Sequence, residues 1–257
     1  MFSKNEVIVF ILPRSPWPPF AGQSRLSFYR ARELKKLGYK VILISISNFR
    51  DLSSFAMENF EEIFHEVHLI KLKKIDFLYI FTNALFSRCF RNLPLQCSWL
   101  NSPRILNLFE EKLKTLIKKN KKIIFHFYSI RSFYLWSFAE KYKKPFFIDL
   151  IDSMSLNIKG KFFNNKEFHK KIFWNLEYKS TNYFEKNLPF YQNCRGFLVV
   201  SEIDKKFLSL KNSNKNNLIF VNNIGCEIPN KLNQEDANNN NIIFFGSLNY
   251  EPNITAI

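Results

Sequence analysis

The feature that most constrains the fold of this chain is a regular alternation of short β-branched and aromatic runs with segments of helical period. Such runs are typical of strands buried in a parallel sheet, and the helical segments supply the crossovers that parallel strands require. We predict strands at 7–12, 41–46, 67–72, 123–127, 146–150, 197–200 and 218–221, and helices at 24–37, 52–66, 104–119, 132–141, 167–186 and 202–210. The pattern therefore predicts an α/β fold with a Rossmann-like, doubly wound, mostly parallel sheet.

The last part of the chain differs from the rest. Residues 231–241 are polar, include four consecutive asparagines and lack periodicity, which is typical of a linker. Residues 242–245 then form an apolar run, Gly246 suits a tight turn, and Pro252 suits the first turn of a helix. We expect residues 1–230 to form one domain, 231–241 to form a linker, and 242–257 to be the incomplete start of a second Rossmann-like domain.

The charge of the chain leaves several partners open. Lys and Arg number 38 against 22 Asp and Glu, which gives a net charge of +16. The lysines are concentrated in segments such as 112–122 and 141–144, which are typical of solvated faces. The sequence carries no nucleic-acid-binding motif, so we predict no nucleic-acid partner, and peripheral contact with an anionic membrane stays open.

Targeting and metal-binding signals are weak. The apolar run 7–12 is too short for a signal peptide, and the run 77–86 is bracketed by Asp76 and Arg88, well short of the roughly 20 residues that span a bilayer. We predict a cytoplasmic protein, with peripheral association at the inner face of the membrane as the alternative. The four cysteines form no CxxC pair and have no histidine at ligand spacing, so we predict neither a metal site nor a cofactor.

The candidate site lies in the loops that follow the strands, because ligands of open parallel sheets bind beyond the carboxyl ends of their strands. The first loop is rich in proline and ends at Gly22, just before a predicted helix whose free N–H groups and dipole favour an anion. Arg25 could add positive charge there. A rigid connector that binds nothing is the alternative interpretation of this loop.

The loops after later strands add further candidates. Arg131 follows the strand 123–127 and could bind an acceptor or a phosphate with its planar guanidinium, or could be a surface residue at a helix start. Asp149 and Asp152 end the strand predicted at 146–150, where they could order a cleft or, with Ser153, cap a helix. The loop after the strand 197–200 begins at Ser201. His126 lies inside a strand, and we expect it to be a packed core residue.

Five short motifs occur in one order along the chain. They are Pro18-Pro19-x-x-Gly22-x-x-Arg25, Gly38-Tyr39-x-Val41, Val200-Ser201-x-x-Asp204, Asn222-Asn223-Ile224-Gly225, and Phe245-Gly246-x-Leu248-x-Tyr250-x-Pro252-Asn253. Together they resemble the retaining GT-B glycosyltransferases of the family-four type, particularly the branch that makes surface polysaccharides. That family joins two Rossmann-like domains across a cleft; the first mainly receives the acceptor and the second mainly binds a nucleotide-sugar donor.

The resemblance implies a function and several site residues. It places Gly22 in a loop that faces the donor phosphates and Gly246 in the first loop of the donor domain. The chain departs from the family in having one glycine where many members have two, and in lacking an Arg or Lys soon after Gly246. The acidic E-x7-E element of the donor domain would lie beyond Ile257, so no catalytic residue is predicted and we expect the chain alone to be inactive.

The predicted function is transfer of a sugar from a nucleotide diphosphate to a glycan or lipid-linked acceptor with retention. A nucleotide-sugar epimerase of the same architecture is the alternative enzyme. A non-catalytic fragment or a basic membrane-docking module is the alternative outside enzymes.

Overall fold

The computed structural model describes residues 6–19, 22–47, 60–164, 167–189, 191–211 and 218–225. The chain divides after Gly225 into two units, and all described residues belong to the first. The predicted linker 231–241, Gly246 and the strand and helix expected at 242–257 lie outside the described residues.

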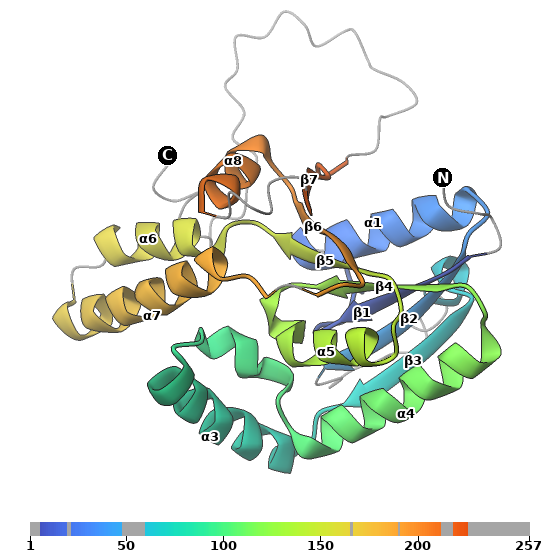
Figure 1. Cartoon of the computed structure of the whole chain (residues 1–257), viewed down its shortest axis with the longest axis horizontal. Coiled ribbons are helices and arrows are strands. Elements are labelled where there is room, and N and C mark those ends of the chain that lie inside the picture. The colour runs from blue at the N-terminus through green and yellow to red at the C-terminus, as the bar shows by residue number, and fades with distance from the viewer. Residues whose placement is uncertain are drawn as a thin grey trace, which may run out of the picture. The chain divides into compact units, whose positions relative to one another are not determined.

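A seven-stranded parallel sheet forms the centre of this unit (Figure 1). Its strands are β1 (Val7–Leu12), β2 (Lys40–Ser47), β3 (Glu66–Lys71), β4 (Ile123–Tyr128), β5 (Phe146–Ile151), β6 (Cys194–Val199) and β7 (Ile219–Val221). They lie in the order β3-β2-β1-β4-β5-β6-β7. This is the doubly wound, Rossmann-like arrangement that the sequence predicts, with β1 and β4 side by side at its centre.

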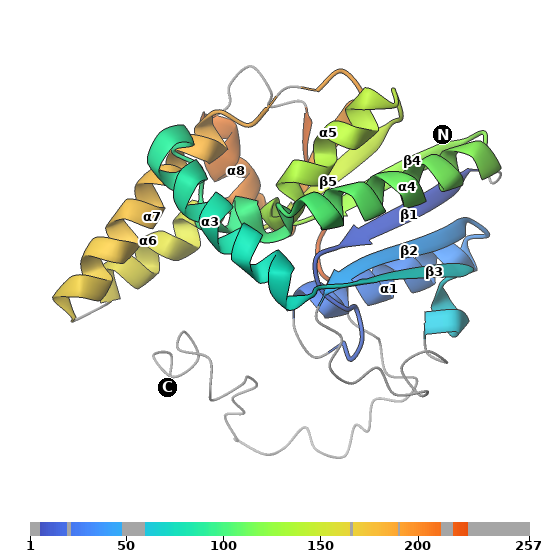
Figure 2. The same cartoon turned by 90° about the horizontal axis from the view of Figure 1, so that it is seen from below.

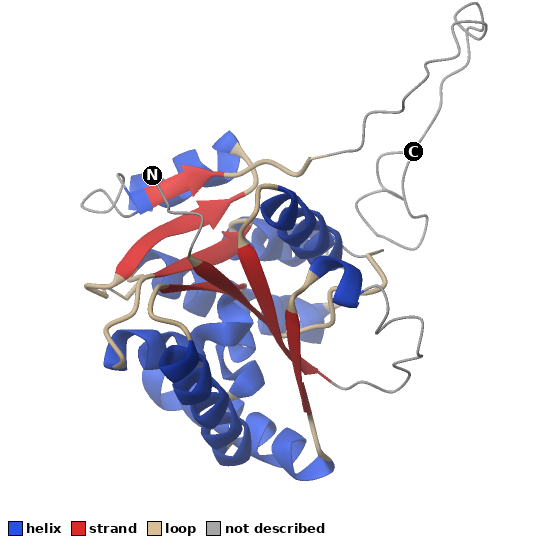
Figure 3. Ribbon diagram, turned by 90° about the vertical axis from the view of Figure 1, so that its right-hand side faces the viewer, coloured by secondary structure: helices blue, strands red, loops and turns tan. Residues whose placement is uncertain are grey.

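Helices connect the strands and cover the sheet on both sides (Figure 3). The α-helices are α1 (Gly22–Lys36), α3 (Lys74–Arg91), α4 (Pro103–Lys119), α5 (Phe133–Lys141), α6 (Met154–Asn164), α7 (Phe168–Lys186) and α8 (Glu202–Lys211), and the 3-10 helices are η1 (Leu95–Leu100) and η2 (Ile130–Ser132). In Figure 2, α3, α4 and α5 lie on the near side of the sheet and α1 lies on the far side.

One predicted helix ends earlier than expected, and two helices were not predicted. The helix predicted at 52–66 is helical at 60–63 but ends before β3 begins at Glu66, and residues 52–59 lie outside the described residues. Helices α3 and α6 were not predicted at all. None of the helices in the described part of the chain is both long and apolar enough to cross a membrane.

The strands divide their side chains between two apolar cores. Phe10 and Leu12 of β1 pack on the α1 side with Leu26 and Phe28, and alternate residues of the same strands face α4 and α5. On the second side, α4 contributes the fully buried residues Ile105, Phe109, Leu113 and Leu116, which recur at helical spacing. Because both cores are apolar and closed, polar side chains with a functional role are expected at the carboxyl edge of the sheet.

Candidate functional site

The two central strands end at the point where the direction of the crossovers reverses. From β1 the chain runs through α1 to β2, and from β4 it runs through α5 to β5 on the opposite side. In open α/β sheets, ligands bind at such a reversal, beside the loops that follow the two strands. The loop after β1 is fixed by short contacts: Ser24 Oγ donates to the carbonyl of Ser15 at 2.9 Å, and Ser45 Oγ donates to the carbonyl of Arg14 at 3.3 Å.

Arg131 follows β4 and is held in place from three directions. Its backbone N–H donates to Ser129 Oγ at 3.1 Å, and Ser129 has a left-handed φ of 59°. Its Nε donates to Gln96 Oε1 at 3.2 Å, and its guanidinium lies 5.3 Å from the ring centroid of Trp99. Both of these partners belong to η1. The side chain is therefore half-buried and pre-oriented at the carboxyl end of β4.

The electrostatic environment of Arg131 is unusual for an arginine. Burial, together with the positive charge of Arg14, lowers its pKa to about 10. Within the described ranges neither Arg131 nor Arg14 has a carboxylate at ion-pair distance. The positive charges of Arg14 and Arg131 thus repel each other near the ends of β1 and β4, and no described carboxylate pairs with either. An anion with two oxygen acceptors, such as a phosphate or a carboxylate, would relieve this repulsion.

Gly22 and Arg25 lie in the first turn of α1. A Cβ added at Gly22 would meet no atom within 4 Å, and Gly22 does not have a left-handed φ. The glycine is therefore not required by a strained turn or by protein packing. Arg25 is exposed, and its guanidinium lies 5.8 Å from the ring centroid of Tyr29. Because α1 is 15 residues long, its amino end carries free N–H groups and a partial positive charge.

Asp152 and Ser201 lie at the ends of β5 and β6 and differ in their roles. Burial raises the pKa of Asp152, and the negative charges of Asp204 and Glu185 raise it further, against a hydrogen bond from Asn157 Nδ2 at 2.6 Å. Ser201 Oγ accepts from the backbone N–H of Asp204 at 3.1 Å, as an N-cap of α8 does. Ser201 has a structural contact, and a role for it in a cleft stays a prediction.

Two glutamates of α7, Glu177 and Glu185, have the E-x7-E spacing by sequence. Both are buried. Glu177 Oε1 accepts from the backbone N–H of Leu95 at 3.1 Å, and Glu185 Oε1 accepts from the backbone N–H of Ser155 at 3.1 Å. These contacts join α7 to η1 and to the start of α6, so the spacing here marks structural residues.

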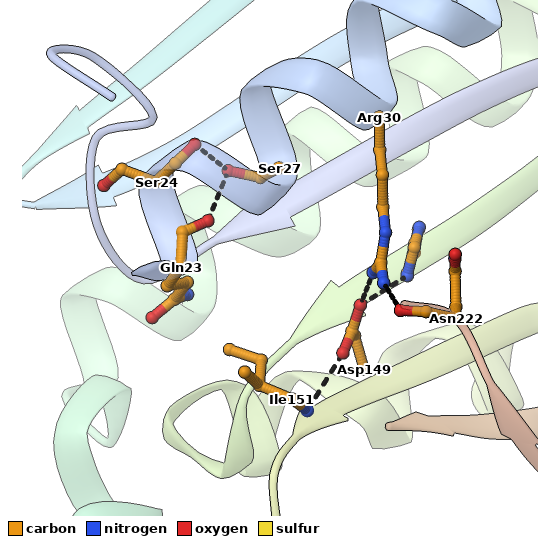
Figure 4. Close-up of polar contacts among 8 residues, drawn as sticks. Gln23, Ser24, Ser27, Arg30, Asp149, Ile151 and Asn222 are labelled. Carbon is orange, nitrogen blue, oxygen red and sulfur yellow. Dashed lines mark hydrogen bonds and ion pairs between the residues drawn. The ribbon is translucent and has the colours of Figure 1, made fainter. Parts of the chain in front are cut away.

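Asp149, named from the sequence as a possible cleft residue, belongs to a buried polar cluster on the α1 side of the sheet whose other members were not predicted (Figure 4). Asp149 is fully buried in β5 and forms an ion pair with Arg30 of α1. Its Oδ1 accepts from the backbone N–H of Ile151 at 2.9 Å, and Arg30 Nη2 donates to the carbonyl of Asn222 at 2.5 Å. A charged residue inside the apolar run 146–151 was the available signal, because buried charges require partners.

His126 and Ile151 complete this cluster. His126 is 8% exposed, its ring centroid lies 4.4 Å from that of Tyr128, and its Nε2 lies 3.7 Å from Asp149 Oδ2. Burial lowers the pKa of His126, although Asp149 opposes this. The prediction that His126 is a packed core residue is confirmed. Ile151 has φ 71°, which is strained for a β-branched residue, and the hydrogen bond to Asp149 helps to hold it.

The described residues were searched for groups that could hold a metal ion and for disulfide bonds. They hold no group of three or more His, Cys, Asp or Glu side chains arranged to hold a metal ion. Cys89 and Cys97 are free thiols, Cys194 Sγ lies 3.8 Å from the carbonyl oxygen of Gly196, and Cys226 lies outside the described residues.

Comparisons with known proteins give distant structural neighbours only. No family model and no curated protein matches the chain. Among solved structures, apo UGT2 from Phytolacca americana is 11% identical over 86% of this chain and 52% of its own, with a TM-score of 0.47. UGT89C1 from Arabidopsis thaliana complexed with UDP-L-rhamnose is 13% identical over 88% of this chain and 54% of its own, with a TM-score of 0.41.

A UDP-N-acetylglucosamine 2-epimerase from Rickettsia bellii is also similar, at 11% identity over 84% of this chain and 44% of its own, with a TM-score of 0.40. The chain thus spans about half the length of the structures it matches. These TM-scores are below 0.5. The fold is therefore assigned from the order of the strands in the sheet, and the activities of these neighbours remain theirs.

Proposed function

We propose that the chain is the acceptor-side part of a retaining GT-B glycosyltransferase of the family-four type. It would take part in moving a sugar from a nucleotide diphosphate to a glycan or lipid-linked acceptor of a surface polysaccharide. The observation that supports this most is the pair of guanidinium groups, Arg14 and Arg131, at the ends of the two central strands without a carboxylate partner among the described residues. The order of the sequence motifs supports the assignment to this family, and with it transfer that retains the configuration of the sugar and a glycan or lipid-linked acceptor.

The chemistry of such a transfer depends on the departing diphosphate. Negative charge grows on its oxygens as the bond to the sugar breaks, and fixed cations near those oxygens stabilise the transition state. Arg131 is well suited because its guanidinium is already oriented by Gln96 and Trp99, so little ordering remains at the moment of reaction. The amino end of α1 adds partial positive charge, and the open space at Gly22 lets a ligand approach the backbone.

Among the described residues we assign Gly22, Arg25, Arg131, Asp152 and Ser201 to the donor or acceptor site. Asp152, whose pKa is raised, would face the acceptor side, where a carboxyl group can hydrogen-bond a sugar hydroxyl. We assign no catalytic residue, metal or cofactor. For the chain alone we propose no turnover, because in the family the donor is held mainly by the second domain.

A transfer assay on the complete open reading frame tests this proposal. The protein would be incubated with radiolabelled nucleotide sugars, with and without a lipid-extract acceptor, and the products separated by chromatography. Label that moves to the acceptor, and only when the acceptor is present, is the expected result. Label that stays on the nucleotide with an altered sugar, without any acceptor, would show an epimerase instead.

A further inference from the structure

Helix α3 packs against the protein through its polar side. Its buried residues are Asp76, Ile80 and Ser87, and Asn83 is half-buried beside them. All four lie on one face because their spacings are four, three and four. Three of the four residues on this inward face are polar, which is the reverse of an ordinary surface helix.

Hydrogen bonds hold this inward polar face in place. Asp76 Oδ1 accepts from Ser102 Oγ at 2.6 Å, and Asp76 also forms an ion pair with Arg104 of α4. Asn83 Nδ2 donates to the carbonyl of Asn101 at 2.8 Å, and Ser87 Oγ lies 3.0 Å from Tyr134 Oη. Turning the other face inward would break these hydrogen bonds and leave the buried partner Ser102 without Asp76, so the contacts fix the orientation of the helix.

The opposite face of α3 is apolar and exposed. Its outermost residues, Leu78, Phe81 and Leu85, are 59%, 63% and 48% exposed. Further exposed apolar side chains on the flanks of the helix are Ile75, Phe77, Tyr79, Phe86 and Phe90. Single exposed apolar residues are ordinary, but a contiguous set of this size on one helix marks an interaction surface.

The charges of α3 indicate the kind of surface it would meet. Lys74, Arg88 and Arg91 are its basic residues, and Lys73 immediately precedes it. Its one acidic residue, Asp76, is buried and paired with Arg104. Lys74 lies on the outward face, four residues before Leu78, and Arg91 is exposed at the end of the helix. The outward face carries no acidic side chain, and the whole chain has a net charge of +16. This composition fits a layer with apolar chains beneath anionic headgroups.

The position of α3 connects this face to the candidate site. It follows β3 and leads directly into η1, whose Gln96 and Trp99 contact Arg131. Figures 1 and 2 both place α3 and the α6–α7 pair at the same end of the sheet. Helix α7 also exposes apolar residues there, with lysines among them: Phe168, Lys170, Lys171, Ile172, Phe173 and Leu176.

We propose that the outward face of α3 docks the protein on an anionic lipid bilayer, with the helix lying in the plane of the interface. Leu78, Phe81 and Leu85 would enter the boundary between headgroups and acyl chains, and Lys73, Lys74 and Arg91 would meet lipid phosphates. The docking does not depend on the proposed transfer reaction. It would bring Arg131 and the loops around it close to acceptors that are held in the membrane.

Vesicle co-sedimentation of the full chain tests the docking. Vesicles of phosphatidylcholine alone would be compared with vesicles in which about one third of the lipid is phosphatidylglycerol, at low and at high salt. The test variant is Leu78→Gln/Phe81→Gln/Leu85→Gln, because glutamine is a good helix former. The matched control is Leu37→Gln, since Leu37 is 62% exposed at the end of α1 on the other side of the sheet.

The expected result is binding to the anionic vesicles that weakens with salt, and a loss of at least about tenfold in the triple variant. Lys73→Gln/Lys74→Gln/Arg91→Gln should lose binding to anionic vesicles by a similar factor, and Leu37→Gln should bind as the wild type does. Circular dichroism should show the helix content of each variant unchanged. No binding by the wild type, an equal loss in Leu37→Gln, or unchanged binding of the triple variant would overturn the proposal. The proposal would also be overturned if the protein formed an oligomer without lipid and the triple variant dissociated it while vesicle binding stayed unchanged, because the face would then bind a second copy of the chain.

Discussion

Replacing Arg30 with methionine should destabilise the protein more than any ordinary surface change. Asp149 is fully buried and Arg30 is 13% exposed, so the variant would leave a carboxylate inside the protein without its main counter-charge. His126 lies 3.7 Å away, but burial lowers its pKa and so disfavours its charged form, which makes it a weaker counter-charge than Arg30. Breaking a buried pair in this way costs about 3–5 kcal/mol. Methionine keeps much of the apolar stem of Arg30, so the loss reports on the charge.

Urea unfolding followed by tryptophan fluorescence and circular dichroism measures this loss. For a domain of this size, about 3–5 kcal/mol corresponds to a fall of roughly 6–20 °C in the thermal midpoint. The double variant Arg30→Met/Asp149→Asn should recover at least half of the loss, since asparagine is uncharged and its oxygen can still accept from Ile151. Arg195→Met, at an exposed arginine, should change stability by less than about 0.5 kcal/mol. A loss below about 1 kcal/mol in Arg30→Met would refute the reasoning.

Three further predictions follow from the cluster and the loops. Because the folded-state pKa of His126 is lowered, the unfolded chain binds the proton more readily, so stability should fall as pH drops below about 6.5. Denaturant titrations from about pH 8 to 5 should show that the free energy of unfolding falls less with pH in His126→Gln than in the wild type. Equal pH dependence in the two proteins would contradict the role of His126. Asp152→Asn should raise the thermal midpoint slightly at pH 7 but not at pH 4. The reason is that the pKa of Asp152 is raised, so its ionised form is disfavoured in the folded protein. A lower thermal midpoint of Asp152→Asn at pH 7 would contradict this prediction. Gly22→Val should leave the thermal midpoint within a few degrees of wild type, since no protein atom lies near an added Cβ. Transfer by the complete protein should fall at least about tenfold, because the β-branched side chain would occupy the space of the ligand. Normal transfer by Gly22→Val would remove Gly22 from the site.

The sheet could be predicted because its strands are almost wholly apolar. The predicted strand 123–127 differs from β4 by one residue at its end, and the predicted helix 104–119 differs from α4 by one at its start. Strand β6 begins three residues earlier than predicted, because Arg195 and Gly196 interrupt the apolar run. In the structure Gly196 makes room for the ring of Phe220, since a Cβ there would lie 2.5 Å from that ring.

Helix α3 was not predicted because its apolar residues face away from the core. Sequence periodicity assumes that apolar residues face the core, and here Asp76, Asn83 and Ser87 face inward while leucine and phenylalanine face outward. The Arg30–Asp149 pair could not be found either, because its residues are 119 positions apart and only the folded sheet brings them together. Arg131 could be predicted because its place after a strand was visible in the sequence.

Binding of inorganic pyrophosphate to the chain, measured by isothermal titration calorimetry, tests the anion site at Arg14 and Arg131. We expect saturable binding that Arg131→Gln and Arg14→Gln each weaken by about 10- to 100-fold, the factor expected for a lost charge-assisted hydrogen bond. The control is Arg195→Gln, because Arg195 lies with Lys121, Lys122, Lys143 and Lys144 around a separate basic hollow. Binding that Arg195→Gln weakens and Arg131→Gln leaves unchanged would place the anion in that hollow and contradict the central claim.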